Sequence, residues 1–464
     1  MRRLAPATRL AALARLAVSW PRTSYTLVCA LAILLLAGGA LNWLSPASPP
    51  GPMATRAVVV YWGFGIAVIS AARAWSRVRR ELMVVLGAVV LAVSVIEVLL
   101  RVLDLPFGLP PLHAVGSRRY HHIHPPNRRM FQGLVEGRPV VIHTNDDGLR
   151  TRFSRAGFRR SPRRVAVLGD SFAFGFGVRD GATIADRLEH HLREMTGRGD
   201  VAVLNAGIVS SSPILAHEVF QGIVASYDPH IVLLLLDATD IGDDITYERR
   251  RRVEGNEVVF DVPDEPSRLD VGRVLTIAAP LAHAAASPVR WAWTQLTGRR
   301  PFSYYQFELQ LDHGVERSRF FIFRYPRAVT DRYFGATLAN VRRLADAVRR
   351  RGMAFGLVVN PRHHLWDAQN CPDSWEAKEY SSSDPYIMEY VRFFDEASAG
   401  VDFPILSLLE PLRAWQGAPL LIACDPHWNE VGSDVAAEAI ARWLGTVMPE
   451  RLERPMTPVS GRSD

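Results

Sequence analysis

The stretch RVAVLGDSF (residues 164–172) decides the fold of the larger part of this chain. It begins as a short apolar run of the kind that forms a buried strand, and that run ends in Gly169. Gly169, Asp170 and Ser171 predict a tight turn from the strand into a helix, with a serine hydroxyl and its backbone N–H exposed. The alternative is that Asp170 and Ser171 only cap the following helix.

Downstream of this turn, apolar strands alternate with amphipathic helices. Further strands are predicted at 201–205, 230–237, 354–360 and 403–408, and helices at 182–195, 214–226, 333–350 and 431–445. Repeated strand–helix units imply a parallel sheet with right-handed crossovers and helices on both faces. We therefore expect a three-layer α/β/α domain whose ligand site lies beyond the carboxyl ends of the strands.

The rest of the chain is organised around that domain. We assign residues 161–447 to the α/β/α domain, with an insertion or cap at about 245–330. Residues 106–160, rich in Pro, His and Arg, are expected to be a juxtamembrane linker with a strand near 138–145. Residues 448–464 are expected to be a flexible tail, and residues 1–105 a membrane anchor.

Three apolar runs predict that anchor. Residues 25–44 contain no charged side chain and are long enough to cross a bilayer, and residues 57–72 and 82–100 form two further runs. For each run the alternative is a buried core helix. Residues 1–23 carry five Arg and no acidic residue, which predicts a cytoplasmic N-terminus. Three spans then place the large domain outside the cytoplasmic membrane.

The distribution of charge argues against a nucleic-acid partner. The chain carries a net charge of +7, but residues 1–105 hold eleven Arg and only three acidic residues. The remainder is therefore close to neutral and offers no basic surface to a phosphate backbone.

A second motif, DPHWN (425–429), precedes the last predicted helix. A serine nucleophile needs a base, and an imidazole suits that task near neutral pH. His427 is such a base, and Asp425 is close enough along the chain to fix its tautomer and stabilise its cation. Taken alone, the motif is better explained as a loop histidine beside an unrelated turn aspartate.

Two further loops follow predicted strands, at 205–207 (NAG) and 237–240 (DATD). A Gly at position 207 lets the backbone approach a ligand and offer its N–H. Each loop alone is only a turn, but the four motifs stand in order at one edge of the predicted sheet. Their combination predicts a single crevice.

Together these blocks resemble those of SGNH/GDSL hydrolases over roughly residues 161–446: GDSF (169–172), NAG, the turn at 237–240 and DPHWN. The N-terminal arrangement resembles membrane-anchored bacterial members. In those, an apolar helix ending in a Glu and an Arg leads through a segment like Asn145, Gly148 and Arg150 into the hydrolase domain. The resemblance implies an SGNH (flavodoxin-like) fold in the bacterial cytoplasmic membrane, with the catalytic domain periplasmic.

The resemblance also implies roles for individual residues. Ser171 matches the nucleophile and first oxyanion donor, Gly207 the second donor, His427 the base and Asp425 its partner. The third donor of the family is an Asn, and the matching position here is Thr239. A Thr hydroxyl has a different reach from an Asn side-chain amide. This difference from the family pattern leaves acyl transfer open as an alternative to hydrolysis.

Three functions remain open from the sequence. The first is a serine esterase that removes O-acyl groups, most simply O-acetyl groups, from envelope carbohydrate or lipid. The second is a polysaccharide O-acetyltransferase that uses the same Ser-His-Asp site. The third is an envelope assembly protein that keeps the fold without catalysis. None of the three requires a cofactor.

Histidine and cysteine patterns give weaker expectations. His121, His122 and His124 lack a carboxylate or Cys at a convincing spacing, so no metal site is predicted. His363 and His364, which follow the fourth predicted strand, are expected to be an exposed loop pair, with a role in a substrate pocket as the alternative. Cys371 and Cys424 would lie at the same sheet edge in an oxidising compartment, which predicts a disulfide, with two unpaired thiols as the alternative.

Overall fold

The computed structural model describes residues 112–255, 257–262, 307–312, 314–366, 376, 379–380, 383–423 and 425–453, with scattered residues between 89 and 109. The chain divides into two compact units, Met1–Pro110 with Pro266–Arg299 and Pro111–Glu265 with Arg300–Asp464. The second unit holds every strand described below, together with the candidate active site.

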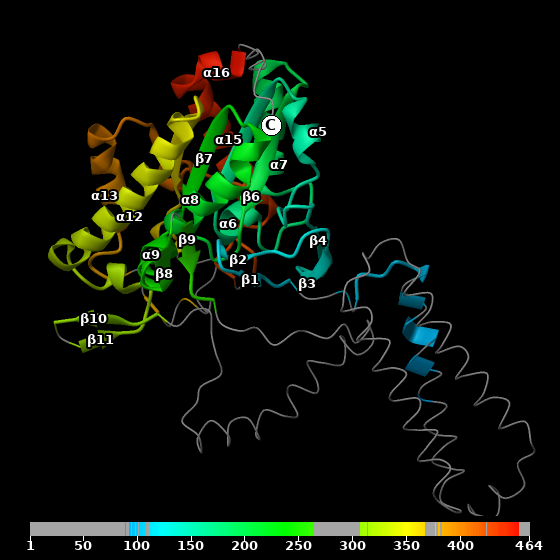
Figure 1. Ribbon diagram of the computed structural model, residues 1–464, viewed down its shortest axis with the longest axis horizontal. Helices are drawn as coiled ribbons and strands as arrows, with labels where there is room; N and C mark the ends of the chain where they lie inside the picture. The colour runs from blue at the N-terminus through cyan, green and yellow to red at the C-terminus, as the bar shows by residue number, and fades with distance from the viewer. Residues whose placement is uncertain are drawn as a thin grey trace, which may run out of the picture. The chain divides into compact units, whose positions relative to one another are not determined.

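Five parallel strands form the central sheet of this unit, in the order β13-β12-β7-β5-β6 (Figure 1). They are β5 (Arg163–Gly169), β6 (Val201–Gly207), β7 (Ile231–Leu236), β12 (Ala354–Val359) and β13 (Ile405–Ser407). The first strand, β5, pairs with β6 on one side and β7 on the other. The chain therefore reverses its direction of travel across the sheet beside β5, and such a switch point opens a crevice at the strand ends.

Alternate side chains of the strands feed two hydrophobic cores. Ala166, Leu168, Leu234 and Leu357 point to one core, while Val167, Leu233 and Leu235 point to the other. Strands covered on both faces need apolar side chains on both faces, which explains their continuous apolar runs. The three-layer α/β/α architecture with a parallel sheet is therefore confirmed.

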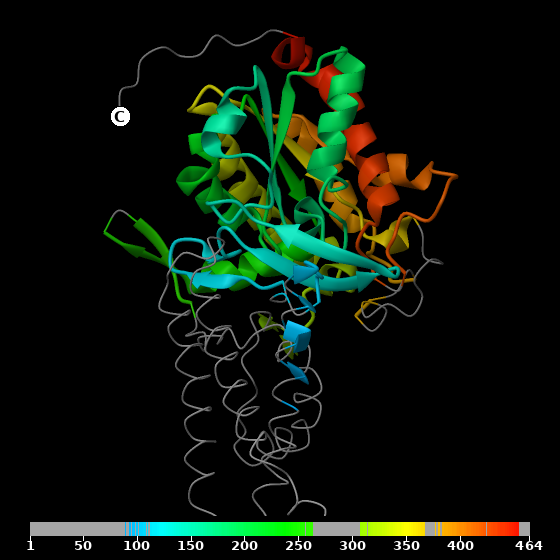
Figure 2. The same ribbon diagram turned by 90° about the vertical axis from the view of Figure 1, so that its right-hand side faces the viewer.

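Helices cover both faces of the sheet (Figures 1 and 2). One face carries α8 (Pro213–Gly222), α9 (Thr239–Arg250), α12 (Arg327–Arg349) and α13 (Glu389–Ala397), and the other carries α7 (Ile184–Thr196), α14 (Leu409–Arg413) and α15 (Glu430–Val447). The start of α7 is fixed by a capping box, in which Thr183 and Asp186 satisfy each other's backbone N–H groups.

Short elements complete the unit. Four antiparallel hairpins pair β1 (Val115–Ser117) with β2 (His121–Ile123), β3 (Arg129–Val135) with β4 (Arg138–His143), β8 (Arg251–Glu254) with β9 (Glu257–Phe260), and β10 (Leu309–Leu311) with β11 (Gly314–Glu316). Short helices are α5 (Arg155–Arg159), α6 (Ser171–Phe174), α16 (Pro449–Glu453), η1 (Val224–Tyr227), η2 (Phe321–Phe323), η3 (His363–Leu365) and η5 (Ser398–Gly400).

The region predicted as an insertion, about 245–330, is partly integrated into the fold. Its first residues complete α9, which begins at Thr239 and was not predicted as a helix. Its last residues, including Phe320, Phe321 and Phe323, are buried in the main core. Sequence periodicity did not predict that these residues join the core. They lie in and beside η2, whose three residues are too few to show a repeating pattern.

The predicted membrane runs 25–44 and 57–72 lie outside the described residues, and the run 82–100 is described only in part. Within the described part of the chain, no helix combines the length and the apolar character needed to span a bilayer.

Candidate active site

Ser171 is the first residue of α6, directly after β5. Gly169 makes this turn possible: its φ is +147°, and a Cβ at this position would lie 2.7 Å from the carbonyl oxygen of Leu235. The Asp170 carboxylate accepts a hydrogen bond from the N–H of Phe172 and so caps the helix. The N–H of Ser171 belongs to the first turn of α6, whose donors have no intrahelical acceptor.

Two hydrogen-bonding contacts link Ser171 to His427 and His427 to Asp425. Ser171 Oγ is 2.9 Å from His427 Nε2, and His427 Nδ1 is 2.5 Å from Asp425 Oδ1. The same carboxylate oxygen accepts the backbone N–H of His427 at 2.9 Å. The structure thus brings the three predicted catalytic residues together in the order nucleophile, base and carboxylate.

The loop that carries His427 is held from both ends. The carbonyl oxygen of His427 accepts the N–H of Ile422, and Asn429 caps α15 through the N–H groups of Val431 and Gly432. Trp428 is buried against the sheet core. These contacts fix the height of the imidazole above the strand ends.

Two aromatic rings border the imidazole. The ring centroids of Phe172 and Phe176 lie 5.0 Å and 4.7 Å from that of His427. Burial opposes ionisation of the Asp425 carboxyl, but the hydrogen bond and charge of His427 outweigh it and hold the pKa of Asp425 below its usual range. Asp425 therefore remains a carboxylate that can stabilise an imidazolium.

The two other predicted oxyanion donors are engaged elsewhere. The N–H of Gly207 donates to Asn205 Oδ1 at 3.0 Å, and its Cα packs against the α6 backbone, where a Cβ would lie 2.2 Å from Phe174 N. The hydroxyl of Thr239 donates to Asp237 Oδ2 at 2.6 Å. In this structure the Gly207 N–H and the Thr239 hydroxyl donate to protein acceptors, and their roles as oxyanion donors stay predictions.

Buried charged groups lie next to the serine turn. Arg362, which follows β12, pairs with Asp237 at 2.7 Å, and its guanidinium carbon lies 5.3 Å from the centre of the Phe172 ring. Burial, and next the charge of Asp237, raise the pKa of Asp170 to about 7. Burial likewise raises the pKa of Asp240 well above its usual value. Sequence reasoning missed this network, although the polar string after the apolar strand β12 was a signal for it.

The segment containing Asn145, Gly148 and Arg150 supports the nucleophile turn. Buried Arg150 donates to the carbonyl oxygens of Gly175 at 2.6 Å and Val178 at 2.5 Å, just after α6. Gly148 has a φ of +76°, and a Cβ there would lie 2.2 Å from the carbonyl oxygen of His124. The predicted linker therefore holds part of the candidate active site in place.

His121, His122 and His124 have structural contacts. His122 Nε2 is 2.8 Å from the carbonyl oxygen of Val209, and His124 Nε2 accepts the N–H of Val209 at 3.3 Å. The other four ring nitrogens also have partners: His121 with His122, His121 with Arg250, and His124 with the His113 carbonyl. These residues fasten the loop after β6.

The pair His363 and His364 differs from the prediction. His363 is only 2% exposed and His364 is half-buried, so the pair is not an exposed loop pair. Burial lowers the pKa of His363 to about 3, with the charges of His364 and Arg362 as further causes. Burial lowers the pKa of His364 to about 4, with the charge of Arg362 as a further cause. Cys371 and Cys424 lie outside the described residues, and their pairing stays a prediction.

Comparison with known proteins gives only distant similarities. No protein-family model and no curated protein matches the chain. A lipase/acylhydrolase from Enterococcus faecalis is 14% identical, covering 64% of this chain and 99% of its own, with a TM-score of 0.32. The acetyl xylan esterase AlAXEase is 13% identical, covering 61% and 99%, with a TM-score of 0.32. A two-domain esterase active on acetylated mannans is 12% identical, covering 64% and 53%, with a TM-score of 0.31.

Scores this low carry no argument about activity. The strand order and the Ser-His-Asp series of this chain are what agree with the resemblance to SGNH/GDSL hydrolases, and any functional assignment rests on that geometry.

Proposed function

We propose that this protein is a serine esterase that removes O-acyl groups, most simply O-acetyl groups, from carbohydrate or lipid of the bacterial cell envelope. The observation that carries the proposal is the hydrogen-bonded series Ser171, His427 and Asp425, with Ser171 Oγ 2.9 Å from His427 Nε2. A serine, an imidazole and a carboxylate in this order form the arrangement that activates a hydroxyl for acyl transfer.

In the proposed reaction, Ser171 Oγ attacks the carbonyl carbon of the ester while His427 Nε2 accepts the hydroxyl proton. The negative charge moves to the carbonyl oxygen, where the N–H of Ser171 is positioned as a donor. The imidazolium, paired with Asp425, then protonates the leaving alcohol as the C–O bond breaks. Water, deprotonated by His427, attacks the acyl-enzyme, and release of the carboxylic acid restores Ser171.

The proposal includes a membrane location. The three apolar runs would anchor the chain in the bacterial cytoplasmic membrane, with the α/β/α domain on the periplasmic side. The described residues of the third run support it, because Val95, Ile96 and Leu99 are each about half exposed. Apolar side chains exposed along one helix are costly in water and suit contact with lipid.

An active-site label tests the proposed nucleophile. The full chain, purified in detergent, is treated with a fluorophosphonate probe beside the Ser171→Ala variant. Labelling of the wild type alone is expected, because only a serine activated by a base reacts readily. Equal labelling of both proteins, or no labelling of a folded wild type, would contradict the proposal.

Hydrolysis and transfer are separated by the products. Incubation with an O-acetylated oligosaccharide is expected to release acetate at the same rate with or without an added acceptor sugar. If acetate release is negligible and acetyl groups appear on the acceptor instead, the protein is an O-acetyltransferase that uses the same serine.

A further inference from the structure

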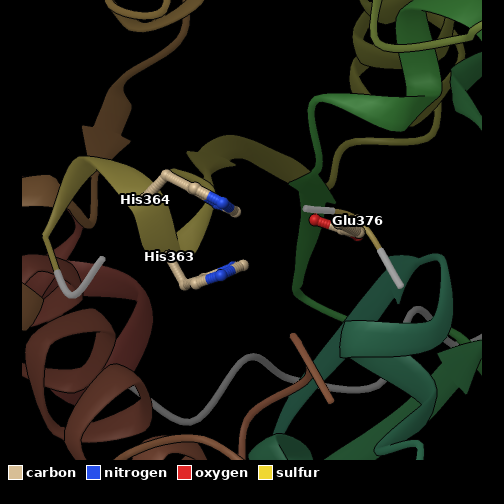
Figure 3. A group of neighbouring side chains, drawn as sticks. All are labelled: His363, His364 and Glu376. Carbon is tan, nitrogen blue, oxygen red and sulfur yellow. The ribbon is translucent and has the colours of Figure 1, made fainter. Parts of the chain in front are cut away.

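Two neighbouring histidines after β12 place their side chains on the same side of the backbone. His363 and His364 open η3, and their ring centroids lie 3.9 Å apart at an angle of 51°. Figure 3 shows both rings directed toward the carboxylate of Glu376. Consecutive residues usually point apart, so this shared direction needs a reason.

Glu376 Oε2 accepts a hydrogen bond from the Tyr380 hydroxyl, but four other polar atoms of this group lack hydrogen-bond partners among the described residues. They are Nδ1 and Nε2 of His363, Nδ1 of His364 and Oε1 of Glu376. His363 is 2% exposed and Glu376 is fully buried, so water does not readily replace the missing partners. By contrast, all six ring nitrogens of His121, His122 and His124 have partners.

The surroundings favour an additional positive charge. Arg362 Nη1 lies 3.0 Å from Glu376 Oε1 without hydrogen-bonding geometry, and Arg362 Nη2 pairs with Asp237. Asp170 is a third buried carboxyl within electrostatic reach of the same guanidinium. Burial raises the pKa of Asp170 to about 7, so this group adds only part of a charge near neutral pH. Asp237 and Glu376 together still exceed the single charge of Arg362, which leaves buried negative charge that a cation would offset.

We propose that His363, His364 and Glu376 bind a divalent transition-metal ion of the Zn²⁺ class. One ligand atom from each residue lies within 4.8 Å of the others. Two imidazoles and one carboxylate form a donor set suited to zinc, and they leave a position for water. Ligand atoms around tetrahedral zinc are about 3.3 Å apart, so each pair of ligand atoms approaches by at most about 1.5 Å on binding.

The proposed metal ligands are not the residues of the proposed esterase chemistry, Ser171, His427 and Asp425, although His363 and Glu376 lie within electrostatic reach of Asp425 and His427. Binding is therefore measured both in the wild type and in a Ser171→Ala background. If the esterase proposal fails, metal binding persists in both proteins, and if the metal proposal fails, fluorophosphonate labelling of Ser171 persists.

The test uses the full chain in detergent, without a polyhistidine tag. After stripping with chelator and dialysis against Zn²⁺, elemental analysis is expected to find one zinc per chain, with a rise in the thermal midpoint. Co²⁺ is expected to give the visible absorption of a nitrogen- and oxygen-ligated tetrahedral site. Mg²⁺, which prefers oxygen ligands and six-coordination, is expected to have no effect.

The variants His364→Ala and Glu376→Gln are expected to weaken Zn²⁺ binding roughly a hundredfold. Losing a side chain that only hydrogen-bonds to a metal ligand already weakens binding by about 10–100-fold, and losing a ligand itself should cost at least as much. The half-buried position of His364 makes that variant the safer one for folding. His190→Ala with His191→Ala is the matched control, since these are also adjacent histidines, on α7. Binding that survives both site variants, or is lost in the control, would overturn the proposal, as would a folded wild type without zinc.

Discussion

Arg362 and Asp237 form an ion pair of 2.7 Å in which the two side chains are 4% and 0% exposed. Asp237 follows β7 and Arg362 follows β12, and these two strands are neighbours in the sheet. The pair therefore joins two strand ends at the edge where Ser171 also lies. Neither charge reaches water, so each depends on the other.

Replacing Arg362 by Met is expected to destabilise the folded domain by about 3–5 kcal/mol, because it leaves the Asp237 carboxylate buried without its cation. Urea unfolding followed by circular dichroism measures the change. Adding Asp237→Asn is expected to restore part of the loss. Arg442→Met, which breaks an exposed pair with Glu438, is the control and should cost less than about 1 kcal/mol.

Asp425→Asn is expected to slow fluorophosphonate labelling by about 10³–10⁴-fold, because Asn no longer fixes the tautomer of His427 or stabilises its cation. The thermal midpoint of the variant should stay close to that of the wild type. Asp434→Asn, at a partly exposed carboxylate beside His191, is the matched control. A labelling rate unchanged in Asp425→Asn would remove Asp425 from the proposed mechanism.

Asp170→Asn is expected to change how stability depends on pH. The pKa of Asp170 is about 7 in the folded chain, above its ordinary value of 3.8, so the folded state holds a proton that the unfolded state releases. The stability that the folded state gains from this proton is complete below pH 3.8 and is lost as the pH rises through 7. Asn keeps the helix cap without a charge.

Denaturant unfolding at intervals from pH 5 to 8.5 measures this effect. The variant should gain stability relative to the wild type as the pH rises toward 7, with no further gain above about 8. The control is Asp346→Asn, at an exposed carboxylate paired with Arg349. A difference between Asp170→Asn and wild type that is constant with pH would contradict the raised pKa.

Arg150→Lys is expected to destabilise the domain by about 2–3 kcal/mol, since a lysine cannot reproduce the hydrogen bonds to the Gly175 and Val178 carbonyl oxygens. Labelling of Ser171 should also slow, because Phe176 in the same loop contacts His427. Arg442→Lys, at an exposed position on α15, is the control. Equal stability of the two variants would show that Arg150 does not hold the loop.

A reporter enzyme that is active only outside the cytoplasm, fused after residue 464, is expected to be active. The arginine-rich segment 1–23 and three apolar runs lead to that topology. A fusion that accumulates at full length but stays inactive would place the α/β/α domain in the cytoplasm.

The strands and the Ser-His-Asp series were predictable from sequence because they depend on local signals. Apolar runs such as IVLLLL (231–236) identify buried strands, and parallel strands carry their following loops to one edge. The hydrogen-bond acceptors of the Gly207 N–H and the Thr239 hydroxyl were not predictable in the same way. Which acceptor a given N–H or O–H meets depends on side chains such as Asn205 and Asp237, whose orientation is set by packing.

The burial of His363 was missed for a related reason. Its neighbours in sequence are polar, so no periodic pattern separates it from an exposed turn. Its burial follows from contacts outside its own turn, among them the one with the Glu376 carboxylate. Long-range packing of polar residues leaves little trace in a single sequence.

The sequence separation of 256 positions between Ser171 and His427 affects how the protein is made. A ribosome synthesises Ser171 early and the DPHWN segment only near the end of the chain. A nascent or prematurely terminated polypeptide therefore carries the serine without its base, and Ser171 cannot form the acyl-enzyme. Under the proposed mechanism, loss of the last forty residues or so silences the protein completely, whereas proteolysis beyond α16 leaves the Ser-His-Asp series intact.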